Sequence, residues 1–174
     1  MEQRTLGADV RVGAVGLGCA GMSGAYGPSA DEQGIGVTAY GVLAQGMLTG
    51  TWRPSAADAR HRGHLPRFAA GNVETNLALV ERLREIAASR GVTVAQLAIA
   101  WVLAQGRAHR DVVALVGAGR PHRITEAVDA AGLRLTEDDL DTIEQAVPRG
   151  AVAGERYAPA LLALLDSERT GGRR

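Results

Sequence analysis

The sequence predicts an α/β fold with parallel strands, and two observations carry this prediction. Short apolar runs typical of buried strands occur in residues 9–18, 36–43 and 111–116. Segments with the apolar spacing of helices lie between and after the last two of these runs. Strands and helices that alternate along a chain are typical of a parallel sheet covered by helices. The length of 174 residues corresponds to one domain.

The first half of the chain is rich in glycine and in loops. Residues 9–18 predict a short strand that runs into a glycine-rich loop, and residues 19–36 show neither helical nor strand periodicity. The run GVTAYGVL at residues 36–43 predicts a buried parallel strand. The polar, arginine-rich residues 44–71 then predict a second long connection.

Two successive helices are predicted next. Residues 73–89 carry apolar side chains at helical spacing, with Asn72 as the expected N-cap and Gly91 as the stop. Thr93 is expected to cap a second helix over residues 94–106, which is so apolar that it must be largely buried.

The last part of the chain predicts a strand and two further helices. Residues 111–116 form the strand, and the helix HRITEAVDAA follows the short loop GAGRP. Thr136 and Asp139 resemble a capping box, with Asp in place of the usual Glu, and open a last helix that ends near Ala146.

The composition excludes several classes of protein. Acidic and basic residues balance at 19 each, which argues against a partner that is nucleic acid or an anionic membrane. No apolar run is long enough to span a membrane and the N-terminus lacks a signal-peptide core, so we expect a cytoplasmic protein. The lone Cys19 allows no internal disulfide. The chain has no lysine, which excludes every catalytic lysine.

One glycine motif matches a dinucleotide-binding fingerprint in letters only. Gly16, Gly18 and Gly21 have the spacing GxGxxG, but a true site needs a helix to start at these glycines. The sequence MSGAYGPS that follows cannot start a helix, so we interpret the motif as a tight turn between strand and loop.

A second glycine loop, residues 117–121, lies between a strand and a helix and has two interpretations. Its glycines let backbone amides approach an anion, and Arg120 and Arg123 can meet a phosphate at the helix N-terminus. Glu126 lies on the same helix face as Arg123. An ordinary turn with solvated arginines explains the same residues equally well.

Other polar residues give no site. The acids between residues 137 and 141 lie where a helix N-terminus favours negative charge, and the serines have no nucleophile motif. No metal-ligand pattern joins the four histidines, His61, His64, His109 and His122.

Several stretches of the chain, taken in order, carry a resemblance to a known family. They are VGLGCAGMSGAYGPSADE, GIGVTAYGVLAQGMLTG, NLALVERLREIAASRGVTVAQLAIAWVLAQG, VVALVGAGRPHRITEAV, and AVAGERY followed by LLDSER. Together they resemble the aldo-keto reductases. The first is similar to the family's first barrel strand and its loop, and the second to the seventh strand and cofactor loop. The third resembles the seventh-unit helix, the fourth the eighth strand with its phosphate loop and helix, and the last the C-terminal tail.

The resemblance implies a (β/α)8 barrel that is incomplete. A full barrel needs about 250 residues. Here residues 1–32 match the first strand and its loop, and residues 33–174 match strands seven and eight with the C-terminal helices. Units two to six, which carry the family's catalytic Asp, Tyr, Lys and His, are missing. Tyr26 lies in the first loop and not in the catalytic tyrosine's motif, so we expect one truncated domain with no catalytic residue.

The resemblance also implies half of a nicotinamide-cofactor site. Tyr40 stands where an aromatic ring stacks on nicotinamide, and Arg62 matches a basic residue that contacts phosphate. Two arginines at the 2′-phosphate favour NADP(H) over NAD(H). After strand seven, the residues expected to wrap the pyrophosphate are Tyr40, Gly41, Val42, Leu43, Ala44, Gln45 and Gly46. After strand eight, those expected to hold the 2′-phosphate and adenine are Gly117, Ala118, Gly119, Arg120, Arg123 and Glu126.

Three functions follow from these expectations. The first is an oxidoreductase fragment related to NADPH-dependent reduction of small aldehydes and ketones, inactive alone because its tetrad is missing. The second is a non-catalytic module that binds NADP(H) or a partner subunit, and the third is the relic of a deletion. Three parallel strands cannot close a barrel, so we also expect exposed sheet edges that favour self-association.

Overall fold

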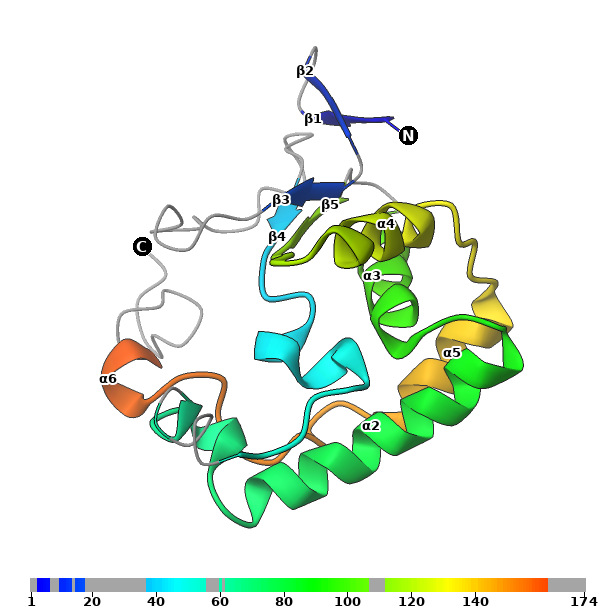
Figure 1. Ribbon diagram of the computed structural model, residues 1–174. Coiled ribbons are helices and arrows are strands. Elements are labelled where there is room, and N and C mark those ends of the chain that lie inside the picture. The colour runs from blue at the N-terminus through cyan, green and yellow to red at the C-terminus, as the bar shows by residue number, and fades with distance from the viewer. Residues whose placement is uncertain are drawn as a thin grey trace, which may run out of the picture.

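The computed structural model describes residues 3–6, 10–13, 15–17, 37–55, 60, 62–106 and 112–162 (Figure 1). The strands are β1 (Gln3–Leu6), β2 (Val10–Gly13), β3 (Val15–Leu17), β4 (Val37–Ala39) and β5 (Val112–Val116). The short 3-10 helices are η2 (Ala44–Thr49) and η3 (Pro66–Phe68). The α-helices are α2 (Asn72–Ser89), α3 (Val94–Ala104), α4 (Pro121–Ala130), α5 (Glu137–Ala146) and α6 (Pro159–Leu162).

A parallel sheet with the strand order β3-β5-β4 forms the centre of the fold. Val15 of β3 pairs with Ala114 of β5, and Val37 of β4 pairs with Val112 of the same strand. The α/β class and the parallel strands are therefore confirmed. The last strand in the sequence, β5, lies between the two earlier ones.

The strands differ from the sequence prediction in two ways. The predicted strand over residues 36–43 is wrong beyond Ala39, because the chain turns at Gly41, where φ is +68°, and coils into η2. Residues 10–13 do not extend the parallel strand but pair antiparallel with β1, which the sequence analysis missed. The predicted connection over residues 44–71 contains η2 and η3.

The helix starts show where local sequence signals suffice. Thr93 and Thr136 cap α3 and α5 as predicted, each accepting a backbone N–H from the third helical residue. The predicted N-cap of α2 is wrong, because Gly71 precedes the helix and Asn72 is its first residue. The amide of Asn72 donates instead to the carbonyl oxygen of Pro66, at 2.9 Å.

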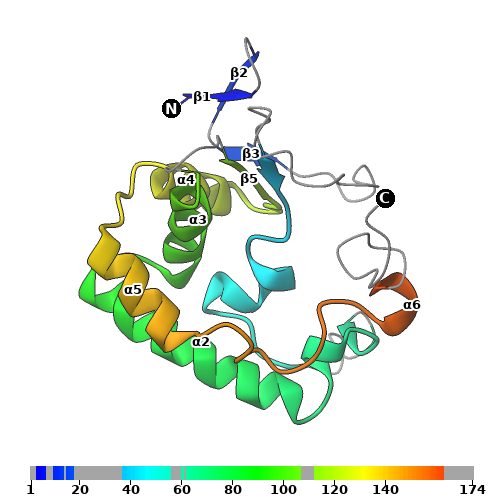
Figure 2. The ribbon, with the colours of Figure 1, turned by 180° about the vertical axis from the view of Figure 1, so that it is seen from behind.

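The apolar helix α3 joins two core clusters. Ile99 and Leu103 pack with β5 and α4, whereas Val94 and Leu97 face α2 and α5 in the second cluster. Figure 2 shows α4 beside α3, and α5 along α2. Burial on both sides explains why the sequence of α3 is apolar all round.

Within the ranges described above, no single helix is both long and apolar enough to cross a membrane. The helices α2 and α3 meet the criteria of length and composition only as a pair, and the chain bends by 88° between them.

Candidate functional site

Two loops leave the sheet at the same edge. Ala39, the last residue of β4, pairs with Ala114 of β5, and both strands run in the same direction. The loop that begins at Tyr40 and the loop that begins at Gly117 therefore both start at the carboxyl ends of neighbouring strands (Figure 1). This edge is where parallel α/β folds place their ligand sites. It places the starts of the two predicted loops at the ends of neighbouring strands.

The first loop has an unusual backbone. Ala44 and Gln45 have φ angles of +46° and +58°, in the left-handed region that side-chain-bearing residues rarely adopt. Gly46 continues this geometry at +97°. Backbone N–H groups of Ala44 and Gly46 donate to the carbonyl oxygens of Gly41 and Leu43, both at 2.8 Å, and hold the turn. Such strain persists only where the surroundings enforce it, and it clusters at ligand sites.

Arg62 is the group that holds this turn from outside. Its Nε donates to the carbonyl oxygen of Gln45 at 3.1 Å. Its guanidinium lies 6.0 Å from the ring centre of Trp52 and 5.9 Å from that of Phe68. These two rings meet edge to face, with centres 5.2 Å apart. The structure thus brings Arg62 to the first loop, beside the residues with which the sequence grouped it.

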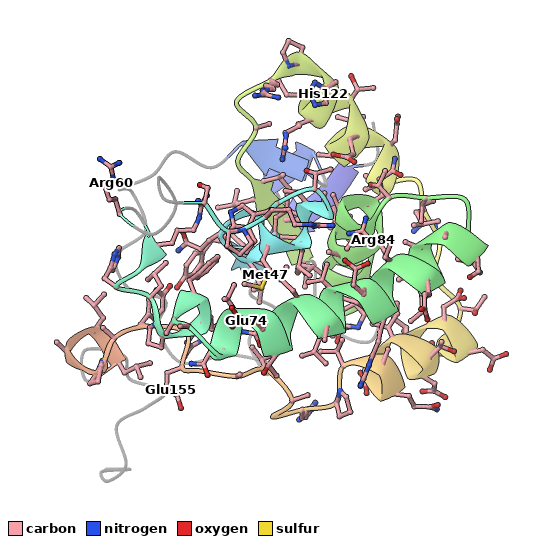
Figure 3. The ribbon with its side chains drawn as sticks, turned by 60° about the horizontal axis from the view of Figure 1, so that its bottom comes forward. Met47, Arg60, Glu74, Arg84, His122 and Glu155 are labelled. Carbon is pink, nitrogen blue, oxygen red and sulfur yellow. The ribbon has the colours of Figure 1, made fainter. Side chains whose placement is uncertain are left out.

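The side chains of the first loop divide between core and surface. Val42 is buried in the core cluster around β5, so only its backbone is available to a ligand. Met47 of η2 is buried and belongs to the second core cluster, to which α2 also contributes (Figure 3). Tyr40 is 44% exposed. A ring left open in this way can stack on a planar ligand.

The second loop is open. Gly117, Gly119 and Arg120 are exposed, and Arg123 is half-buried on the first turn of α4. A Cβ atom added at Gly117 or Gly119 would meet no atom within 4 Å. Neither glycine has the positive φ that would require it for the backbone, so the space beside them is free for a group that approaches closely. Figure 3 labels His122 at the start of this helix.

Glu126 has a structural partner. Its carboxylate accepts a hydrogen bond of 2.7 Å from the hydroxyl of Thr93, the N-cap of α3. This bond joins α4 to α3, a role that the sequence analysis did not foresee. Ala127 beside it is 3% exposed and belongs to the core. The contact of Glu126 with adenine stays a prediction.

A tyrosine from the C-terminal part of the chain meets Tyr40. The two hydroxyl oxygens of Tyr40 and Tyr157 lie 2.6 Å apart, across 117 residues of sequence. Burial, together with this hydrogen bond, raises the pKa of Tyr157 to about 12. Tyr157 belongs to the stretch AVAGERY, and nothing in the pattern of that stretch signals this contact.

Buried Asn76 anchors the same C-terminal segment. Its amide nitrogen donates to the carbonyl oxygens of Arg67, at 3.1 Å, and Ala153, at 2.9 Å. Its Oδ1 accepts from the N–H of Ala153 at 2.8 Å. Sequence reasoning also missed this residue, because one polar side chain on an amphipathic helix gives no sign of what it binds.

Several predictions lie outside the described residues. They concern the turn at Gly18 and Gly21, the loop of residues 19–36, Cys19 and Tyr26, and two of the four histidines. Among the residues that the structure does describe, no group of three or more His, Cys, Asp or Glu side chains could hold a metal ion.

Comparisons with known proteins agree with the resemblance. The sequence model of the "Aldo/keto reductase family" matches residues 28–148. The chain is 37% identical over 132 residues to "Probable aldo-keto reductase 1" of Glycine max, covering 75% of this chain and 37% of that protein. It is 31% identical over 130 residues to "Aldo-keto reductase yakc [NADP(+)]" of Schizosaccharomyces pombe (strain 972 / ATCC 24843), covering 74% of this chain and 37% of that protein.

A solved structure shows the same relation in three dimensions. The glycerol dehydrogenase AKR11B4 from Gluconobacter oxydans matches with a TM-score of 0.61 at 30% identity, over 69% of this chain and 36% of that one. The chain therefore spans less than half the length of these relatives. Its parallel sheet and helices are similar to part of a barrel fold.

Proposed function

Because this chain belongs to the aldo/keto reductase family, we propose that it binds NADP(H) at the carboxyl edge of its sheet and does not reduce a carbonyl substrate by itself. The observation that carries the proposal is the pair of loops at that edge. The first loop has a strained backbone that Arg62 holds by a hydrogen bond, and the second has free space beside its glycines. A truncated domain, in which residues 1–32 and 33–174 correspond to the two ends of the family barrel, is part of the same proposal.

The second loop supports the phosphate end of the cofactor site. The open space beside Gly117 and Gly119 fits a phosphate, which needs close approach to the backbone. Arg120 and Arg123 lie at the N-terminus of α4, where the helix dipole also favours an anion. Two guanidinium groups there match a dianionic 2′-phosphate, which NADP(H) carries and NAD(H) lacks.

The first loop supports the nicotinamide end. Tyr40 offers a partly exposed ring for stacking, and the backbone from Gly41 to Gly46 would face the pyrophosphate. Arg62 braces this backbone and brings positive charge to it. When bound, NADPH supplies the hydride that the reductases of this family transfer to a carbonyl carbon.

The absence of turnover follows from the side chains available. The family's tetrad contains a lysine that tunes the catalytic tyrosine, and this chain has no lysine at any position. A tyrosine without such a neighbour is a poor proton donor at neutral pH, because its usual pKa is about 10. The carbonyl substrate of the wider family is therefore no substrate of this chain alone.

A second candidate function is a partner-binding module. Within the described residues, β3 and β4 each pair with β5 and with no other strand. A strand with one free edge can pair with another chain, whether a second copy or a chain that carries the missing barrel units. Reductase activity that arises only when such a chain is mixed with this one would support it. A cytoplasmic location stays a prediction under either function.

The test of cofactor binding uses paired arginine variants. We expect Arg120→Ala with Arg123→Ala to weaken NADPH binding at least about tenfold, because charge-assisted hydrogen bonds to the 2′-phosphate are lost. NADH, without that phosphate, should lose less than about threefold. The matched control is Arg82→Ala with Arg149→Ala, which removes the same charge from exposed positions on α2 and after α5. Equal losses for both cofactors would remove the 2′-phosphate assignment.

A further inference from the structure

The C-terminal segment 151–157 runs from a contact with α2 to the first loop. Its anchor is Ala153, which exchanges two hydrogen bonds with the side chain of Asn76 on α2. Gly154 lies against Pro66, so closely that a Cβ there would come within 2.6 Å of the carbonyl oxygen. Its end is Tyr157, whose hydroxyl bonds to that of Tyr40.

We propose that Tyr157 is a positioning residue, which fixes the ring of Tyr40 in the orientation that stacks on nicotinamide. This inference rests on the proposed function and adds a residue to it. Tyr40 is 44% exposed, so packing covers only part of its ring. A hydrogen bond of 2.6 Å at the far end of the ring limits its rotation, because it holds the hydroxyl to an anchored neighbour.

Tyr157 is itself held well enough to serve as this anchor. It is half-buried, and the guanidinium of Arg156 lies 5.9 Å from the centre of its ring. Two residues before Arg156, the carbonyl oxygen of Gly154 faces the Nε of Arg67 at 3.5 Å. The hydrogen bonds of Asn76 to Ala153 fix the start of the segment. A side chain whose backbone is held at several points loses little further freedom when it holds another.

The expected consequence is selective for the nicotinamide ring. A ring that is already oriented binds its partner without the entropy cost of ordering, so the hydrogen bond raises affinity by preorganisation. A neutral hydrogen bond of this kind changes an equilibrium about fivefold. The adenosine end of the cofactor lies in the other loop and should not respond.

The test compares two ligands and two single variants. Tyr157→Phe removes one hydroxyl and keeps the ring, and Tyr40→Phe removes the other hydroxyl and keeps the stacking surface. Each should weaken NADPH binding about fivefold, and the double variant should lose no more than either single one, because both remove the same bond. Binding of 2′-phospho-ADP-ribose, which lacks the nicotinamide ring, should stay unchanged. The matched control is Val152→Ala, an exposed position of the same segment.

Each other outcome overturns the proposal in a recognisable way. Equal weakening for NADPH and 2′-phospho-ADP-ribose would mean that Tyr157 supports the fold and not the ring. Unchanged NADPH binding in Tyr157→Phe would mean that the hydrogen bond does not orient Tyr40. If the unaltered chain binds 2′-phospho-ADP-ribose as tightly as NADPH, no stacking exists to position. If it binds neither ligand, the proposed function fails and this inference fails with it.

Discussion

The side-chain amide of Asn76 forms a two-way pair with the backbone of Ala153, donating to its carbonyl oxygen at 2.9 Å and accepting from its N–H at 2.8 Å. The pair joins α2 to a segment 77 residues later. Asn76 is 3% exposed and is the one buried polar residue of the described chain. A side-chain amide is tolerated in the buried face of a helix when its hydrogen bonds are satisfied. Here the hydrogen bonds of Asn76 hold the C-terminal segment against α2.

Asn76→Ala should therefore lower the free energy of unfolding by about 3 kcal/mol, since it removes three hydrogen bonds and leaves partly buried backbone groups of Arg67 and Ala153 without this partner. Urea unfolding followed by circular dichroism measures this loss. Asn72→Ala is the matched control, because the amide of Asn72 makes one hydrogen bond to Pro66 and is half-buried. Its expected cost is about 1 kcal/mol. Equal losses would show that the pair with Ala153 adds nothing.

Substitution of Gly154 and of Gly150 distinguishes two costs of an added Cβ atom: a clash with a neighbouring residue and strain of the backbone. Both have positive φ, +80° and +83°, but only Gly154 faces an atom that a Cβ would strike, the Pro66 carbonyl oxygen at 2.6 Å. Gly154→Ala should cost at least about 2 kcal/mol, and Gly150→Ala about 1 kcal/mol. Thermal unfolding of the two variants compares them directly. A Gly154→Ala variant as stable as Gly150→Ala would show that the segment does not press against Pro66.

Because of Asp139, we expect the stability of the folded protein to decrease at acidic pH. The backbone N–H of Thr136 is the main group that holds the pKa of Asp139 below its usual value, helped by the Thr136 hydroxyl and by Arg90 at 2.9 Å. A carboxyl whose pKa is lowered by folding stabilises the protein above its unfolded pKa of about 3.9, and that stability is lost as pH falls through the lower folded value.

The measurement is urea unfolding of the unaltered chain and of Asp139→Asn across acidic pH. The variant should be less stable at neutral pH, and the difference between the two curves should shrink between about pH 5 and pH 2. Curves that stay parallel over this range would contradict the assignment of Asp139 as the titrating group.

Arg62→Ala should weaken both the first loop and NADPH binding. The variant loses the hydrogen bond to Gln45 and the contacts with Trp52 and Phe68, worth together about 1–2 kcal/mol of stability. Arg60→Ala, an exposed neighbour in the same arginine-rich stretch, is the control and should change neither quantity. Calorimetric NADPH titration of both variants tests this pair. Similar affinity in the two would remove Arg62 from the site.

Features that depend on residues close together in the sequence, such as helix caps and buried helix faces, are mostly predicted correctly. Thr93 and Thr136 are identified as caps because each bonds to a residue three positions on, within reach of a local pattern. The apolar sequence of α3 predicts its burial for a similar reason. The predicted N-cap of α2 is wrong because the side chain of Asn72 binds Pro66, which lies outside the helix. No local pattern shows which carbonyl oxygen a side-chain amide will reach.

Long-range contacts explain what the sequence could not show. The pairing of β2 with β1, the bonds of Asn76 to Ala153 and the hydroxyl pair of Tyr40 and Tyr157 each depend on the fold. For the same reason the sequence does not show that the carboxylate of Glu126 also accepts a hydrogen bond from Thr93, 33 residues earlier; its contact with a ligand stays a prediction. The family resemblance groups the two loops, and the parallel register of β4 and β5 gives the physical reason that both loops start at the same end of the sheet.

The central claim is that the chain folds and binds NADPH through these two loops. Thermal unfolding followed by circular dichroism, with and without NADPH at about one hundred times its Kd, tests it most directly. We expect a cooperative transition whose midpoint temperature NADPH raises by about 5 °C or more, with a smaller rise for NADH at the same concentration. A broad transition that neither cofactor moves would contradict it, and family membership would then describe ancestry alone.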